Sequence, residues 1–110
     1  MASTPDPPYY AVIFTNRRAA WGDEAADFAY GAAAERMEEL AATIPGYLGI
    51  ESSRSSDGAG ITVSYWESNA SIAEWRSHPE HLDTQSRGRS DWYEWYELRV
   101  GRIERARSFP

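Results

Sequence analysis

The sequence predicts one α+β domain in which helices cover one face of an antiparallel sheet. The chain has 110 residues, which is close to the common size of a single domain. One long segment repeats its apolar residues with the spacing of a helix. Several short segments are rich in the β-branched and aromatic residues that are typical of strands. No linker or low-complexity block divides the chain, so these segments are expected to share one core.

The first strand is expected at residues 9–15, a run of aromatic and β-branched side chains. A long helix should follow, with Asp23 placed to cap its first turn and Pro45-Gly46 placed to end it. Its apolar positions keep the spacing of one helical stripe: Tyr30, Ala33, Ala34, Met37, Leu40, Ala41 and Ile44. This stripe is expected to face the sheet.

A β-hairpin is expected next, with strands at residues 47–54 and 61–66. The turn between them, residues 55–60, consists almost entirely of Ser, Asp and Gly, which favour turns. The second strand alternates two sets of side chains, Ile61, Val63 and Tyr65 against Thr62, Ser64 and Trp66. Such alternation suits a sheet with one covered face.

The second half of the chain predicts two shorter helical segments. Ser68 or Asn69 can cap the first of them. The His78-Pro79 pair breaks it, and Pro79 suits the first turn of the next helix, which should run to about Arg89.

An aromatic cluster at residues 91–96 precedes a final strand, which is expected at 98–103 because its side chains alternate. The order is therefore β-α-β-β-α-β, the order of the ferredoxin-like fold, an antiparallel sheet with two helices on one face. The domain is expected to span residues 9–104, between a disordered lead at 1–8 and a polar tail at 105–110.

Composition excludes several classes of function. The net charge is −6, which argues against nucleic acid or an anionic membrane as a partner. There is no cysteine, which excludes disulfides, thiolate nucleophiles and cysteine-ligated metals and fits a cytoplasmic protein. No segment approaches the ~20 apolar residues of a membrane-spanning helix.

Two short segments carry a resemblance to a known family. The run Pro45–Glu51 (PGYLGIE) and the run Tyr65–Ser68 (YWES), followed by Ile72 and Trp75, resemble the antibiotic biosynthesis monooxygenase family at the family's spacing. The resemblance extends over nearly the whole domain, from about residue 10 to residue 103. It implies a homodimer in which two sheets pack face to face as a dimeric α/β barrel. The aromatic side chains at 92–96 are consistent with such an interface.

The same resemblance implies a site, and the family contains more than one activity. Its quinone-forming monooxygenases need no cofactor and place an Asn, a Trp, a Tyr and an Arg around an aromatic substrate. Trp66 matches the Trp, whereas Thr62 stands at the Asn position and Ile72 at the Tyr position. Arg87 or Arg89 is the candidate for the Arg.

The heme-degrading members use an Asn, a Trp and a His. Asn16 and Trp66 correspond to the first two, but Gln85 stands at the His position, and an amide oxygen is a poor ligand for iron. His81 lies one helical turn before Gln85, so a slip of one turn in the correspondence would restore an imidazole. Other members of the family have no known activity.

His78 and His81 are the two histidines of the chain. They lack a matching third ligand, so no metal site is expected, and a solvated helix start is the favoured interpretation. As a general base His81 is the more interesting, because imidazole titrates near neutral pH. Trp66 is either a structural residue at a strand end or the wall of an aromatic pocket.

We therefore expect a monooxygenase-like enzyme without a cofactor, acting on a small aromatic or polyketide-like molecule near Trp66. The expected catalytic residues are His81, Asn16 and Trp66, and the expected substrate-binding residues are Trp75, His78, Gln85, Thr62 and Ile72. The alternative is a non-catalytic, ligand-binding protein of the same fold, because the reactive groups of both better-understood activities are incomplete here.

Overall fold

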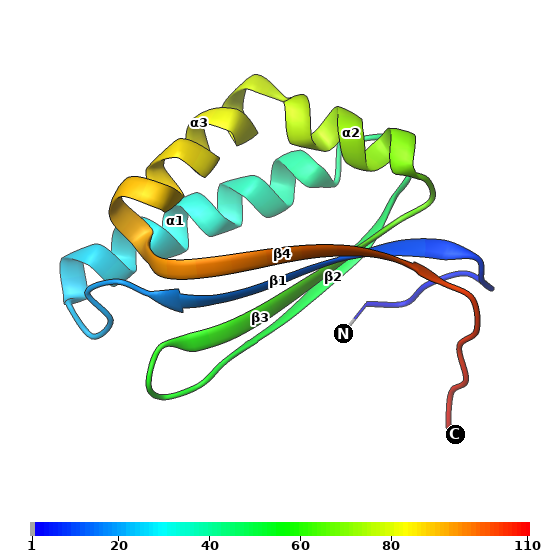
Figure 1. Ribbon diagram of the computed structural model, residues 1–110, viewed down its shortest axis with the longest axis horizontal. Coiled ribbons are helices and arrows are strands. Elements are labelled where there is room, and N and C mark those ends of the chain that lie inside the picture. Colours follow the sequence, from blue (N-terminus) through cyan, green and yellow to red (C-terminus); the bar gives the residue numbers. More distant parts are fainter. Residues whose placement is uncertain (1) are drawn as a thin grey trace.

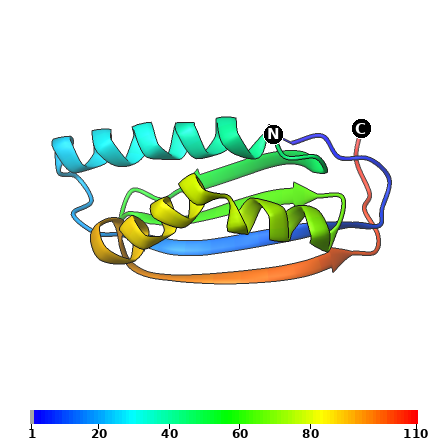
Figure 2. The ribbon, with the colours of Figure 1, turned by 90° about the horizontal axis from the view of Figure 1, so that it is seen from above.

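The computed structural model describes residues 2–110 and contains a four-stranded antiparallel sheet in the order β2-β3-β1-β4. Along the chain the elements are β1 (Tyr9–Arg18), α1 (Glu24–Ala41), β2 (Tyr47–Arg54), β3 (Ala59–Trp66), α2 (Asn69–Ser77), α3 (Pro79–Arg87), the π-helical turn η1 (Gly88–Trp92) and β4 (Tyr93–Ile103). The helices all lie on one side of the sheet (Figure 1). Seen from above, α1 runs beside the pair α2 and α3 (Figure 2). The predicted ferredoxin-like fold is confirmed, and within one chain the sheet does not close on itself.

Helix α1 begins where the sequence predicts and ends slightly earlier. The Asp23 carboxylate accepts a hydrogen bond from the Ala26 N–H at 2.9 Å, which satisfies a free donor of the first turn. The helix ends at Ala41, three residues before the end of the predicted stripe. Ile44 precedes proline, and a residue in that position disfavours helical backbone. Ile44 is nevertheless buried, so the stripe faces the core as expected.

The helices of the second half are capped by the side chains that precede them. Ser68 Oγ accepts from the Ser71 N–H at 3.1 Å. His78 Nδ1 accepts from the Glu80 N–H at 3.2 Å, and Pro79 occupies the first turn of α3 as predicted. Helix α3 ends at Arg87, two residues before the predicted end.

Strand β4 begins at Tyr93, five residues before the predicted start at Leu98. Most of the predicted aromatic cluster is therefore strand. The rings of Tyr93 and Tyr96 pack against Phe14 of β1, with centroids 5.2 and 5.3 Å apart. This cross-strand packing extends β4 toward its N-terminal end. The strand conformation of these residues therefore comes from their contacts with β1 and not from their local sequence.

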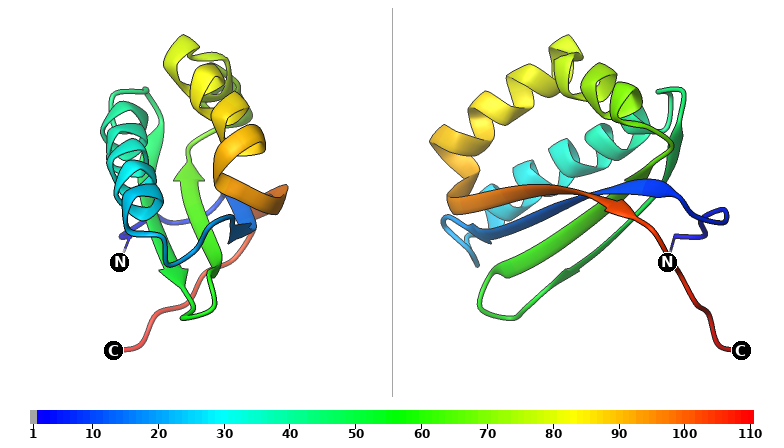
Figure 3. Two further views of the ribbon diagram at one scale, coloured as in Figure 1. Left: turned by 90° about the vertical axis from the view of Figure 1, so that its left-hand side faces the viewer. Right: turned by 45° about the vertical axis from the view of Figure 1, so that its right-hand side comes forward.

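The register places alternate residues of the strands toward the helices. Phe14 of β1 is paired with Thr62 of β3 and Leu98 of β4. The buried core lies at one end of this face and consists of Ala41, Ile44, Trp66 and Ile72. The other face of the sheet carries no helix (Figure 3).

Residue 1 of the predicted disordered lead lies outside the described residues. Residues 2–8 form no helix or strand, but the Ala2 N–H donates to Glu51 Oε2 at 3.4 Å and Thr4 Oγ1 donates to the Tyr9 hydroxyl at 3.1 Å. The tail after β4 extends away from the sheet (Figure 3). None of the helices in residues 2–110 has the length and apolarity needed to cross a membrane. The cytoplasmic location stays a prediction.

Candidate functional site

A cavity of about 450 Å³ lies between the helices and the covered face of the sheet. Its walls come from all four strands and from α1, α2 and α3. The middle of the cavity is apolar, with Val12 and Phe14 from β1, Met37 from α1 and Leu98 from β4. A mostly apolar enclosure with a few polar side chains is typical of a small-molecule site.

Trp66 forms one end of this cavity. It is the last residue of β3 and its relative exposure is 0%. Its indole Nε1–H donates to Ser64 Oγ at 2.9 Å, and its ring is held between Tyr47, edge-on at 5.4 Å, and Trp75, stacked at 6.3 Å. Trp66 is thus both a core residue and a wall of the cavity, which are the two roles that the sequence left open.

His81 lies at the same end of the cavity. Its imidazole stacks on the indole of Trp75, with ring centroids 3.9 Å apart and planes inclined by 14°. His81 Nδ1 lies 3.0 Å from the backbone oxygen of Trp75. A carbonyl oxygen only accepts, so this hydrogen bond assigns the proton of the neutral imidazole to Nδ1. Nε2 is then the nitrogen with a free lone pair.

The surroundings of His81 favour its neutral form. Burial lowers the pKa of His81, the hydrogen bond to the Trp75 carbonyl raises it, and the nearby His78 lowers it slightly further. The net effect is a pKa below the ordinary value for histidine. Gln85 Nε2 lies 3.4 Å from His81 Nδ1, but both atoms are donors when Nδ1 carries the proton, so this contact is not a hydrogen bond in that tautomer.

The structure brings six of the eight predicted site residues to the cavity wall: Trp66, Trp75, His81, Gln85, Thr62 and Ile72. His78 instead caps α3. Asn16 is 1% exposed and accepts a hydrogen bond from Arg54 Nη1 at 3.0 Å, so it lies behind that arginine. The functional roles of all eight residues stay predictions.

Sequence reasoning missed a polar cluster at the other end of the cavity. Arg54, the last residue of β2, donates from Nη2 to the hydroxyl of Tyr30 at 3.2 Å. The hydroxyl of Tyr93 donates to the same Tyr30 oxygen at 2.8 Å. Burial raises the pKa of Tyr93, and Tyr30 raises it further, so the Tyr93 hydroxyl stays protonated as a donor. Neither Arg87 nor Arg89, the predicted arginines, takes this place: Arg87 lies over the ring of Trp92, 4.7 Å from its centroid.

A second arginine supports this cluster from behind. The Arg18 guanidinium lies 3.9 Å from the centroid of the Tyr30 ring and 3.3 Å from Asp27 Oδ1. Its side chain is 1% exposed, and Arg18 Nε donates to the Trp92 carbonyl at 3.3 Å. The charge of Arg18 is therefore neutralised by Asp27, and its role is to position Tyr30.

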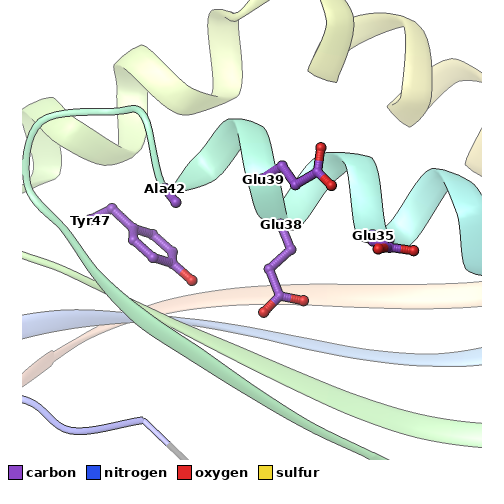
Figure 4. A pocket seen from close by; sticks show the side chains of 5 residues that line it. All are labelled: Glu35, Glu38, Glu39, Ala42 and Tyr47. Atoms are coloured by element: carbon purple, nitrogen blue, oxygen red, sulfur yellow. The ribbon is translucent and has the colours of Figure 1, made fainter.

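A second hollow, of about 400 Å³, lies beside α1 and is lined by Glu35, Glu38, Glu39, Ala42 and Tyr47. The three carboxylates point in different directions and do not converge on one position (Figure 4). Within residues 2–110, no cluster of three or more His, Cys, Asp or Glu is arranged to hold a metal ion. The hollow is therefore a surface feature of α1, and the chemistry-bearing groups lie in the larger cavity.

The model of the family "Antibiotic biosynthesis monooxygenase" matches residues 12–87, which span β1 through α3 and include Trp66, Trp75, His81 and Gln85. The chain belongs to the antibiotic biosynthesis monooxygenase family. The resemblance carried by the PGYLGIE and YWES runs is thereby confirmed. The family match ends just before η1, so it leaves β4 outside the matched residues.

Relatives of this family member are similar along almost their whole length. The protein named "Uncharacterized protein YqjZ" of Bacillus subtilis (strain 168) is 50% identical over 109 residues, covering 99% of this chain and 91% of the relative. The structure of Rv0793 from Mycobacterium tuberculosis has a TM-score of 0.74 at 17% identity, covering 91% of this chain and 99% of that one. A dimeric protein of ferredoxin-like fold from Bacteroides fragilis NCTC 9343 has a TM-score of 0.66 at 13% identity, covering 86% and 96%. At such identities the two structures establish the fold.

Proposed function

We propose that this protein is a cofactor-independent monooxygenase that oxidises a small, electron-rich aromatic or polyketide-like molecule in the cavity beside Trp66. The observation that carries the proposal is the state of His81. The hydrogen bond from Nδ1 to the Trp75 carbonyl leaves the lone pair of Nε2 available, and burial keeps the ring neutral. A neutral imidazole in an aromatic cavity is suited to accept a phenolic proton.

The chemistry needs no electron donor other than the substrate. His81 Nε2 accepts the proton of a phenol, and the phenolate transfers one electron to O2. The resulting superoxide and substrate radical combine into a peroxide anion at a ring carbon, and His81 returns its proton to give the hydroperoxide. Loss of water, formed from the ring C–H hydrogen and the outer OH, leaves a quinone. One oxygen atom of O2 enters the product and the other becomes water, so the substrate is oxidised by four electrons and O2 is reduced by four.

The cavity supports this sequence in two ways. Phe14, Met37 and Leu98 provide an apolar middle that excludes water from the reactive intermediates. Thr62 and Gln85 line the same cavity and offer a hydroxyl and an amide to the developing oxyanion.

Oxygen consumption tests the proposal. We expect the wild-type protein to consume O2 with at least one member of a panel of polycyclic phenols, without added flavin, nicotinamide or metal. His81→Ala should lower the rate by about 10²-fold or more, as for loss of a general base. His78→Asn is the matched control, because it also removes a histidine but keeps an N-cap side chain, and it should retain the wild-type rate. Unchanged turnover in His81→Ala would remove His81 from the mechanism.

A second candidate is a ligand-binding protein without catalysis. Thr62 and Ile72 favour it, because both line the cavity at positions where the resemblance implies an Asn and a Tyr. This function predicts saturable binding of aromatic molecules with no O2 consumption by any member of the panel. Equilibrium binding and oxygen uptake on the same compounds separate the two functions.

For the heme-degrading activity of the family, the chain lacks a histidine at the position that the resemblance implies. Gln85 stands where those members have their histidine, and its amide is a poor iron ligand. The imidazole of the cavity, His81, has one ring face covered by the indole of Trp75, but its Nε2 lone pair is free while Nδ1 donates to a backbone carbonyl. A metal-bound histidine has this arrangement, so His81 is the residue on which a heme titration must be tested. Titration with hemin tests this activity: a change in the Soret band that His81→Ala abolishes would support it, and no change would remove it.

We further propose that the working unit is a homodimer formed through the uncovered face of the sheet. Ile61 of β3 and Trp95 of β4 lie on this face and are 51% and 50% exposed. Their strand partners on β1, Thr15 and Arg17, lie between them, so the two apolar side chains flank the middle of the face. The protein of similar fold from Bacteroides fragilis is described as dimeric, which supports a dimer here.

A further inference from the structure

The cavity is elongated and its two ends differ in chemistry. Trp66 is the last residue of β3. Gly60, which pairs with Arg54 of β2, is the second residue of the same strand. At about 3.3 Å a residue, the two positions are roughly 20 Å apart along the strand. Trp66 and His81 therefore occupy one end of the cavity and Arg54 the other.

Arg54 is a cation without a carboxylate partner in the described part of the chain. The ion pairs found in residues 2–110 involve Arg17, Arg18, Arg36, Arg99 and Arg102. Its acceptors are all neutral: Asn16 Oδ1 at 3.0 Å and the Gly58 carbonyl at 2.7 Å for Nη1, and the Tyr30 hydroxyl at 3.2 Å for Nη2. A fixed, uncompensated charge on a cavity wall favours an anionic ligand.

Donors remain free at this end of the cavity. Nη1 uses both of its hydrogens on Asn16 and Gly58, whereas Nε–H and one Nη2–H of Arg54 have no acceptor within residues 2–110. The oxygen of Tyr30 accepts from both Arg54 and Tyr93, so its own proton is left to donate. Two N–H groups and one O–H can therefore meet the oxygens of an incoming carboxylate.

The sheet is shaped to hold the guanidinium in this position. A Cβ at residue 60 would lie 2.7 Å from Arg54 Nη1 and 2.8 Å from its Cζ, so only glycine leaves room for the guanidinium against β3. Asn16, 1% exposed, orients it from the neighbouring strand. Because the arginine side chain is held in place before the ligand binds, less conformational entropy is lost on binding.

We propose that Arg54 and Tyr30 form an anion-binding subsite that holds the carboxylate of an elongated aromatic substrate, with the ring to be oxidised lying toward Trp66 and His81. The subsite rests on the proposed function only in naming its ligand as the substrate. The proposed substrates are therefore aromatic acids. They would bind in one direction, because the carboxylate lies at Arg54 and the ring to be oxidised lies at the apolar Trp66 end.

Equilibrium binding of two matched probes, 2-naphthoate and its neutral isostere 2-naphthamide, tests the subsite through quenching of tryptophan fluorescence. We expect wild-type protein to bind the carboxylate at least about tenfold more tightly than the amide, the factor typical of a charge-assisted hydrogen bond. Arg54→Gln should abolish this preference while changing the affinity for the amide less than twofold. Arg76→Gln removes another arginine of the cavity wall and should keep the preference.

Retained amide binding shows that a variant is folded. If Arg54→Gln binds neither probe, Tyr30→Phe carries the test, with an expected loss of severalfold in carboxylate affinity alone. Equal affinity of wild-type protein for the two probes, or a carboxylate preference that survives both substitutions or is lost in Arg76→Gln, would overturn the subsite.

These binding measurements do not depend on turnover, so the anion-binding subsite and the monooxygenase activity can be contradicted independently. Selective binding of the carboxylate without O2 consumption by any aromatic acid would retain the subsite and remove the monooxygenase. An O2 consumption rate that changes neither when the substrate's carboxylate is removed nor in Arg54→Gln would retain the monooxygenase and remove the subsite.

Discussion

The imidazole of His81 lies flat against the indole of Trp75, 3.9 Å between ring centroids, while its Nδ1 bonds to the backbone oxygen of that same residue. One residue of α2 thus fixes both the orientation and the tautomer of a histidine on α3. The break at His78-Pro79 permits this contact, because α3 begins at Pro79, directly after the end of α2 at Ser77, and runs in a different direction (Figure 1). The free lone pair of Nε2 is a consequence of the helix break.

This relationship predicts the titration of His81. Burial lowers the pKa of His81, so we expect a midpoint below 6.5, the ordinary value for the side chain. The base is active when neutral. Activity should therefore be retained as the pH falls to 6.5 and be lost only below it, as the pH passes through the lowered pKa. NMR titration of the His81 ring measures the midpoint without substrate, and a midpoint at or above 6.5 would contradict the assignment.

His78→Asn separates the two causes of this shift. A charge on His78 lowers the pKa of His81, so its removal should raise the His81 midpoint slightly. Asn retains an acceptor for the first turn of α3, so the helix should persist. A downward shift in this variant would mean that His78 acts in another way.

Trp66 should dominate the stability of the core. Trp66→Ala is expected to lower the free energy of unfolding by about 3–5 kcal/mol, because the side chain is fully buried at the junction of β3 with the core. Phe28→Ala is the control: Phe28 is 81% exposed, and its loss should change stability by less than about 0.5 kcal/mol. Urea denaturation followed by circular dichroism measures both, and equal losses would contradict the placement of the core.

Two glycines should respond to alanine in opposite directions. Gly46 has φ of +94°, and a Cβ there would lie 2.8 Å from Ser71 Cβ, so Gly46→Ala should destabilise by about 1–3 kcal/mol. Gly31 lies within α1 with open space around it, so Gly31→Ala should stabilise by about 0.5–1 kcal/mol. Thermal denaturation of the two variants measures the direction of each change in stability. A stabilised Gly46→Ala would be inconsistent with the turn that follows α1.

The proposed dimer has a direct test in solution mass. Light scattering coupled to size-exclusion chromatography should give twice the mass of one chain. Ile61→Asp, on the uncovered face of the sheet, should give a monomer, whereas Phe28→Asp, an equally apolar-to-acidic change on α1, should leave the dimer intact. A monomeric wild-type protein, or a dimer that tolerates Ile61→Asp, would place the interface elsewhere or remove it.

Periodicity and capping residues predicted most of the fold because those signals are local. Asp23 and Pro79 are residue types that favour the start of a helix, and both lie at helix starts as expected. The predicted start of β4 was wrong because residues 93–97 mix aromatic and acidic side chains without strict alternation, and nothing nearby in the sequence shows their pairing. Their partners on β1, such as Phe14, lie far away along the chain.

The site was predictable at one end and not at the other. Trp66, His81 and Gln85 lie within 20 residues of one another, so helical spacing and the family resemblance brought them together. Arg54 reaches Tyr30 across 24 residues, and Tyr30 reaches Tyr93 across 63, so only the folded sheet shows that they meet. The available signal was the alternation of β2, which places Arg54 on the same side as the covered face.

The central claim is that this cavity transfers one atom of O2 to an aromatic substrate with His81 as the base. Mass spectrometry of the product formed under ¹⁸O2 tests it most directly, using a polycyclic phenolic acid and no added cofactor. We expect one ¹⁸O atom in each quinone product with wild-type protein and with His78→Asn, and about 10²-fold less product with His81→Ala. Product that contains no ¹⁸O, or labelled product formed equally fast by His81→Ala, would contradict the account.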